Sequence, residues 1–201
     1  MDDEIKQNLI KYEAIKQKVF AAFDGVTLGD GIGFWEAYAR DGYLLPTMQE
    51  YQNEKAKDER FDFRKVFNFV EKFRDHSFYA GTSFMNAKGL HFYMPILLLL
   101  GGQERRETVL RDLVEQKEPE YIKLMHLLTT AQKKVIIETV KYDVDYDAEI
   151  EFYINFKGHK CHKCGKIHEP ESYNLYQAKA KVESGDEYFL LQYLKNNLKI
   201  K

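Results

Sequence analysis

The sequence has few cysteines, almost no net charge and no long hydrophobic run. Among its 201 residues there are only two cysteines, Cys161 and Cys164, which lie three positions apart. This spacing is poor for a structural disulfide and better for a shared metal ion. We therefore expect a protein of a reducing compartment, with no framework of disulfides.

The near absence of net charge argues against binding driven by the charge of the whole molecule. Thirty basic and 32 acidic side chains leave a formal net charge of −2. A chain so close to neutral has no long-range field to draw it onto DNA or an anionic membrane, although a local patch remains able to do so.

The hydrophobic runs are too short for a membrane span. The longest, residues 90–100, is interrupted by His91 and Pro95, and a bilayer needs about 20 apolar residues. Residues 1–4 are acidic and lack the basic and apolar regions of a secretory signal. We expect a cytoplasmic protein that makes no contact with a membrane.

Apolar residues three and four positions apart predict helices along most of the chain. The segment 86–100 is apolar nearly all round, so we expect it to be the central helix, packed against the N-terminal helix and against 63–73, with a kink or break at Pro95. Thr47 and Glu50 have the spacing of a capping box. The predicted helices or helical connections cover residues 3–24, 34–40, 47–60, 63–73, 86–100, 108–116, 130–142, 171–183 and 186–198.

Residues 148–156 are ambiguous because isoleucine and phenylalanine alternate there with polar residues, as in a strand. A strand would have no partner except the stretch after the cysteines. The expected fold is mainly α: one irregular multi-helix bundle over residues 1–201, with a Cys/His loop inserted at 157–170. A short hairpin near 148–170 is the alternative to continued helix.

One segment, residues 158–168, has the pattern of a metal site. Two residues between Cys161 and Cys164 let both sulfurs reach one ion at about 2.3 Å. His168 is a candidate third ligand, and His159 is preferred as the fourth because the histidine between the two thiols would point away. We predict one structural Zn²⁺; the alternative is an exposed polar loop with two free thiols.

Two weaker patterns concern binding. Acidic residues concentrate in the first third of the chain, and Asp30, Glu36 and Asp41 are candidates for a face that meets a partner protein. Their alternative role is that of solvated surface. Four glycines in residues 25–33 lack the spacing of a phosphate-binding loop, so we interpret them as a structural loop. The lysines around the two cysteines would suit a nucleic acid, or simply keep the loop soluble.

Three segments resemble a bacterial family known only as a domain of unknown function. They are residues 22–33 together with Asp41-x-Tyr43, residues 83–95, and residues 127–132, and the likeness extends over about residues 15–142. The resemblance implies a small helical protein without an assigned activity, and it hints at neighbours of toxin–immunity systems. The Cys/His loop is not part of it.

No motif pairs a nucleophile with a base. The leading hypothesis is therefore a protein-binding module, of an immunity type that masks a partner such as a toxin. The alternatives are a small nucleic-acid-associated protein that uses a basic zinc knuckle, and an enzyme of unrecognised type.

Overall fold

The computed structural model describes residues 2–73, 81–100, 103–156 and 186–198, and all regular elements in these ranges are helical. The expected mainly-α fold is thus confirmed for this part of the chain. The α-helices are α1 (Asp2–Ala22), α2 (Phe34–Asp41), α3 (Gln49–Lys55), α4 (Phe63–Phe73), α5 (Ala87–Leu100), α6 (Gln103–Glu115), α7 (Pro119–Leu127), α8 (Thr130–Phe156) and α10 (Asp186–Asn197).

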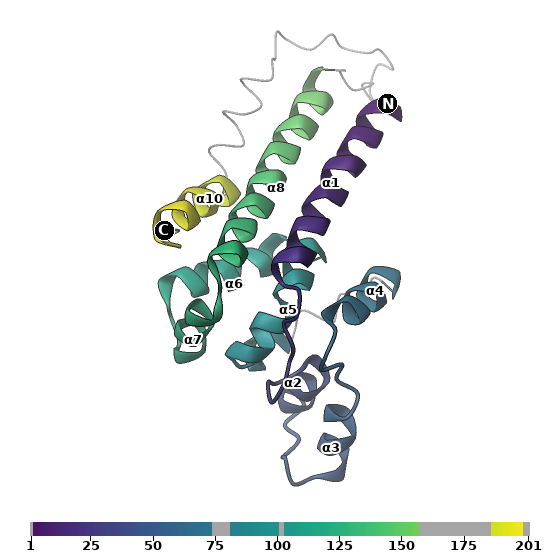
Figure 1. The fold of residues 1–201 in the computed structure, drawn as a ribbon, viewed down its shortest axis with the longest axis vertical. Helices are drawn as coiled ribbons and strands as arrows, with labels where there is room; N and C mark the ends of the chain where they lie inside the picture. The colour runs from purple at the N-terminus through teal and green to yellow at the C-terminus, as the bar shows by residue number, and fades with distance from the viewer. Residues whose placement is uncertain (1, 74–80, 101–102, 157–185, 199–201) are drawn as a thin grey trace, which may run out of the picture.

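The helices form an elongated bundle around α5. The two longest helices, α1 and α8, run side by side, and α10 packs on α8 and α6 (Figure 1). The central helix α5 contacts α1, α4, α6, α7 and α8. At the opposite end from the N-terminus, α2 and α3 pack on each other and project as a pair (Figure 1). None of the helices in the described ranges is long and apolar enough to span a membrane.

The apolar helix α5 is the core of the bundle, as its sequence predicts. Leu97 and Leu98 are buried, and α5 contacts both α1 and α4. Of the kink or break expected at Pro95, the break does not occur: α5 runs through Pro95 to Leu100. His91 is partly buried, and its Nε2 atom lies 3.1 Å from Oε1 of Gln132 on α8.

The strand considered for residues 148–156 is wrong, because these residues continue α8 to Phe156. Extending a formed helix fixes one residue for each new hydrogen bond, whereas a lone strand would leave its backbone unpaired. The helix begins with a reciprocal cap. The Gln132 N–H donates to Oγ1 of Thr129 at 3.2 Å, and the Thr129 N–H donates to Oε1 of Gln132 at 2.9 Å.

Helix boundaries elsewhere differ from the sequence predictions in local detail. Asp62 and Asn86 precede α4 and α5, and each accepts a backbone N–H, from Arg64 and Gly89 respectively, at 3.0 Å. The capping box at Thr47 is wrong: α3 starts two residues later and has no side-chain cap. Helix α6 starts earlier than predicted, and α7 was not predicted at all. The expected helix 171–183 and the loop 157–170 lie outside the described residues.

The glycine-rich loop between α1 and α2 is held by hydrogen bonds within the protein. Arg60 donates from Nη1 to the Gly29 carbonyl at 2.7 Å, and the Ile32 N–H donates to Oδ1 of Asn86 at 3.0 Å. Gly89 of α5 packs directly under the loop, where an added Cβ would overlap the Ile32 carbonyl. The loop therefore docks the start of α2 on α5, which supports the structural interpretation of its glycines.

Candidate partner-binding surface

The three acidic candidates for a partner-binding face do not share one environment. Asp30 and Asp41 are exposed, whereas Glu36 is only 2% exposed. Asp30 pairs with the Lys88 ammonium, whose hydrogen bond lowers the pKa of the Asp30 carboxyl group. A partner could reach Asp30 and Asp41, but the structure shows that Glu36 belongs to the interior.

Glu36 joins α2 to α3 through a network of side chains. Its Oε1 atom accepts hydrogen bonds from the Tyr51 hydroxyl at 2.6 Å and from Nη2 of Arg40 at 3.1 Å. Its Oε2 atom lies 3.2 Å from Nζ of Lys55. Burial alone would raise the pKa of Glu36, but the hydrogen bonds from Tyr51, Lys55 and Arg40 outweigh it, so the pKa is lowered. Glu36 is therefore a fixed, ionised anchor between the two helices.

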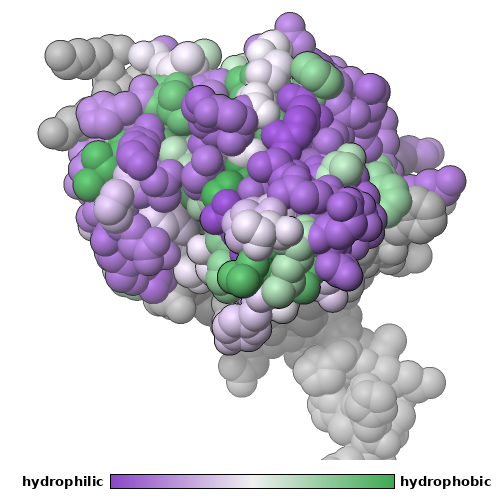
Figure 2. All heavy atoms as spheres, turned by 90° about the horizontal axis from the view of Figure 1, so that it is seen from below, coloured by the Kyte–Doolittle hydropathy of each residue, from purple (hydrophilic) through white to green (hydrophobic). Residues whose placement is uncertain are grey.

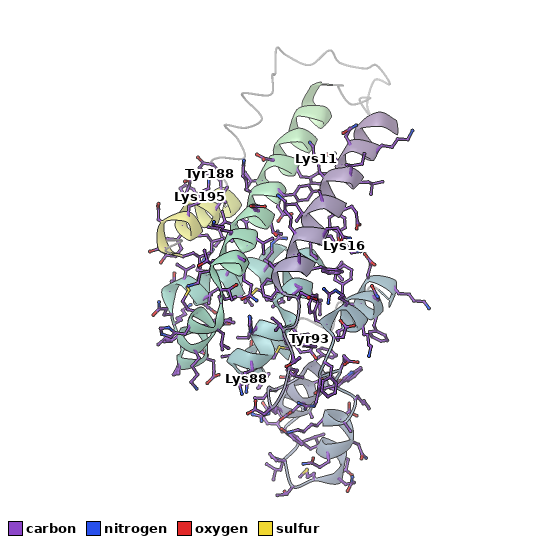
Figure 3. The ribbon with its side chains drawn as sticks, in the orientation of Figure 1. Lys11, Lys16, Lys88, Tyr93, Tyr188 and Lys195 are labelled. Carbon is purple, nitrogen blue, oxygen red and sulfur yellow. The ribbon has the colours of Figure 1, made fainter. Side chains whose placement is uncertain are left out.

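The first turn of α2 has a cap from a distant part of the chain. Asp58 accepts hydrogen bonds from the N–H groups of Trp35 at 2.8 Å and Glu36 at 3.1 Å. The preceding N–H, that of Phe34, donates to the Tyr93 hydroxyl on α5 at 3.1 Å; Figure 3 labels Tyr93. Burial raises the pKa of Asp58, although these backbone hydrogen bonds oppose the rise. The N–H groups of the first three residues of α2 are thus satisfied by buried partners.

Gly33 precedes α2 and leaves the room that Asp58 occupies. The backbone angles of Gly33, φ −80° and ψ −179°, are open to any residue. A Cβ atom at this position would, however, overlap the Asp58 carboxylate. Glycine is needed here for close approach rather than for an unusual backbone conformation.

The connection after α2 ends the helix in an unusual way. The N–H groups of Tyr43 and Leu44 donate to the carbonyls of Arg40 and Ala39, each at 3.0 Å, which is the pattern of a Schellman motif. This motif needs a left-handed residue and normally uses glycine. Here Gly42 has an ordinary φ of −75°, and Tyr43 takes the left-handed position with φ 59°. Gly42 lies one position before the left-handed residue, so it does not relieve the backbone strain at Tyr43.

The end of α2 and the connection after it expose a set of large apolar side chains, which we name the α2–α3 tip: Tyr38, Tyr43, Leu45 and Met48. Tyr43 is the extreme case, with 91% of its surface exposed. The Met48 N–H donates to the Leu45 carbonyl at 2.9 Å, so the turn is ordered while its side chains face solvent. Figure 2, which looks onto this end of the molecule, shows apolar patches among mostly polar residues.

A comparison with known families settles the membership of the chain. The model of a family of unknown function (DUF6714) matches residues 11–152. The chain belongs to this family. No curated protein and no solved structure matches it. The DUF6714 region contains the glycine-rich loop, the Glu36 network and the α2–α3 tip, and it ends before the Cys/His segment.

The predicted zinc ligands, Cys161, Cys164, His168 and His159, lie outside the described residues. Within the part of the DUF6714 chain that the structure describes, no group of three or more His, Cys, Asp or Glu side chains is arranged to hold a metal ion. The zinc site remains a prediction from the sequence.

Proposed function

We propose that the chain is a protein-binding module and that the α2–α3 tip is its contact surface. The observation that carries this proposal is Tyr43, a bulky residue that is 91% exposed at φ 59°. A left-handed conformation costs a residue with a side chain about 1–2 kcal/mol. In the free protein this cost is not offset by burial of the ring, which is exposed. A partner that covers the ring would supply that burial.

The residue types of the tip suit a protein partner. Tyrosine and methionine are enriched in protein interfaces, and buried tyrosines are frequent binding hot spots. Asp41 and Glu50 are exposed in the same segment, so a partner with basic residues around an apolar centre would be complementary. The hypothesis from the sequence, an immunity-type protein that masks a partner such as a toxin, is kept as part of this proposal.

The scaffold beneath the tip supports the same function. Glu36 ties α2 to α3, and Asp58 and Tyr93 fix the other end of α2 on the bundle. An ordered binding surface loses less conformational freedom on association than a loose one, which strengthens binding.

A photo-crosslinking residue at position 43, expressed in the source cells, tests the proposal. We expect it to capture one defined protein, whereas the same residue at position 189 should not. Phe189 is a suitable control because it is an exposed aromatic residue on α10, far from the tip. Equal capture from both positions, or none from position 43, would contradict the proposal.

The alternative of a nucleic-acid-associated protein depends on Lys157, Lys160, Lys163 and Lys166. They lie outside the described residues, so this alternative stays a prediction from the sequence.

A further inference from the structure

A cavity of about 240 Å³ lies between α2, α4 and α5, separate from the α2–α3 tip. Its inner lining is buried and apolar and includes Phe34, Val70 and Tyr93. Trp35 and Phe69 form its partly exposed walls. The cavity thus offers aromatic surface on several sides and an open entrance.

Charged side chains stand at the entrance. Lys57 and Lys65 line the cavity and are exposed, and Glu59 lies beside them. The Lys57 ammonium sits over the Trp35 ring, 5.1 Å from its centroid. The Lys65 ammonium lies 3.3 Å from Oε2 of Glu59. Two ammonium groups therefore flank the aromatic walls.

The carboxylate at the entrance is already engaged by the backbone. Oε1 of Glu59 accepts hydrogen bonds from the N–H groups of Phe61 at 2.9 Å and Arg60 at 3.1 Å. These bonds fix Glu59 in the turn before α4. In the ion pairs of Lys65 with Glu59 and of Lys57 with Glu54, the lysine is exposed and the glutamate is partly buried, and such surface pairs contribute only about 0–1 kcal/mol. Both lysines can therefore turn toward another anion at little cost.

The size of the cavity limits what it can hold. Pockets for drug-sized molecules begin at about 300 Å³, whereas an apolar cavity of about 150 Å³ accepts benzene. The volume of about 240 Å³ suits one ring and a short chain.

We propose that this cavity binds a small organic acid with one aromatic ring and a carboxylate on a short chain. The ring lies between Trp35 and Phe69, over Phe34 and Val70, and the carboxylate meets Lys57 and Lys65. A cationic ligand of the same shape would have to displace the Lys65 ammonium from Glu59 to reach a carboxylate at the entrance, so it binds more weakly. This inference does not depend on the tip or on its protein partner.

Trp35 reports directly on the cavity because it is the only tryptophan in the chain. The probe is 3-phenylpropionate, titrated into the full-length protein while tryptophan fluorescence is recorded. We expect a saturable change with a dissociation constant of about 1 mM or below, ordinary for so small a ligand. The matched alcohol, 3-phenylpropan-1-ol, should bind at least fivefold more weakly, and hexanoate and 3-phenylpropylamine should bind more weakly still.

Variants separate the role of charge from that of shape. Lys57→Gln combined with Lys65→Gln should weaken binding of 3-phenylpropionate about tenfold and leave binding of the alcohol unchanged. Phe69→Ala should weaken both. Lys123→Gln is the control, because Lys123 is exposed on α7. The proposal is overturned if none of the probes gives a saturable change, if acid and alcohol bind equally, or if the double lysine variant binds the acid as the unchanged protein does.

Discussion

Replacing Gly33 by alanine tests how Asp58 caps α2. The backbone of Gly33 is compatible with alanine, so the new methyl group acts only through its overlap with the Asp58 carboxylate. To make room, the carboxylate must leave the N–H groups of Trp35 and Glu36, which it now binds at 2.8 and 3.1 Å. The substitution at position 33 therefore removes the cap of α2 although Asp58, the capping residue, is unchanged.

The expected cost follows from the two lost hydrogen bonds. A buried donor left without an acceptor costs about 1–3 kcal/mol, and loss of a helix N-cap typically costs about 1 kcal/mol. We expect Gly33→Ala to lower the free energy of unfolding by about 2–4 kcal/mol. Asp58→Ala should lower the free energy of unfolding by a somewhat smaller amount. This variant also removes a carboxylate whose burial is unfavourable, as the raised pKa of Asp58 shows.

The two substitutions should not be additive. Once Asp58 is alanine, the methyl group at position 33 has space, so the double variant should be about as stable as Asp58→Ala alone. The coupling energy should then be about 2 kcal/mol or more, as expected for residues in direct contact. Urea unfolding followed by circular dichroism measures the free energy of unfolding of the unchanged protein, the two single variants and the double variant.

Gly42→Ala is the matched control for this cycle. Gly42 has an ordinary φ of −75°, and the nearest atom to an added Cβ is 3.5 Å away. This change should alter stability by less than about 1 kcal/mol. Strict additivity of the substitutions at positions 33 and 58, or a Gly33→Ala protein as stable as Gly42→Ala, would refute the account of the cap.

Three further predictions concern the core, the pH dependence and the metal. Leu97→Ala should lower the free energy of unfolding by about 2–5 kcal/mol, since Leu97 is buried in α5; urea unfolding that shows a loss below about 1 kcal/mol would count against the central role of this helix. The pKa of Glu36 is lowered in the folded state, so its contribution to stability is full above the unfolded pKa of about 4.3 and is lost as the pH falls through the lower folded pKa. Glu36→Gln should therefore flatten the dependence of stability on pH below about 4.3. If urea unfolding showed the same loss of stability at acid pH in the variant as in the unchanged protein, this would be contradicted. Cys161→Ser with Cys164→Ser should abolish zinc binding of about one ion per chain, measured by elemental analysis, while the circular dichroism of the helices stays the same; a wild-type protein purified without chelator and free of zinc would contradict the site.

The helices that the sequence predicts well are those whose evidence is local. The all-round apolar composition of 86–100 identified α5 as the central helix, and Asp62 and Asn86 cap the residues that follow them directly. The region 148–156 was ambiguous because its alternation suits either a strand or one face of a helix, and only the continuation of α8 decides between them.

The binding region was predictable only in part, because its key contacts are not local. Glu36 and Arg40 are four residues apart, so their pairing follows from helical spacing, but Tyr51 reaches Glu36 only after α3 folds back. Asp58 caps a helix that starts 24 residues earlier, and no capping pattern in the sequence shows this. Tyr43 lies in a segment that carried the family resemblance, yet only the backbone reveals its left-handed conformation.

The affinity of the Tyr43→Gly protein for the crosslinked partner tests the central claim most directly. Glycine adopts φ 59° without strain. The free energy of unfolding of this variant should therefore be about 1 kcal/mol higher than that of the unchanged protein. If the tip is the binding surface, calorimetric titration should nevertheless show an affinity reduced about 30-fold, the loss expected for a hot-spot residue. Phe189→Ala should bind as the unchanged protein does. Undiminished affinity of a stable Tyr43→Gly protein would contradict the account.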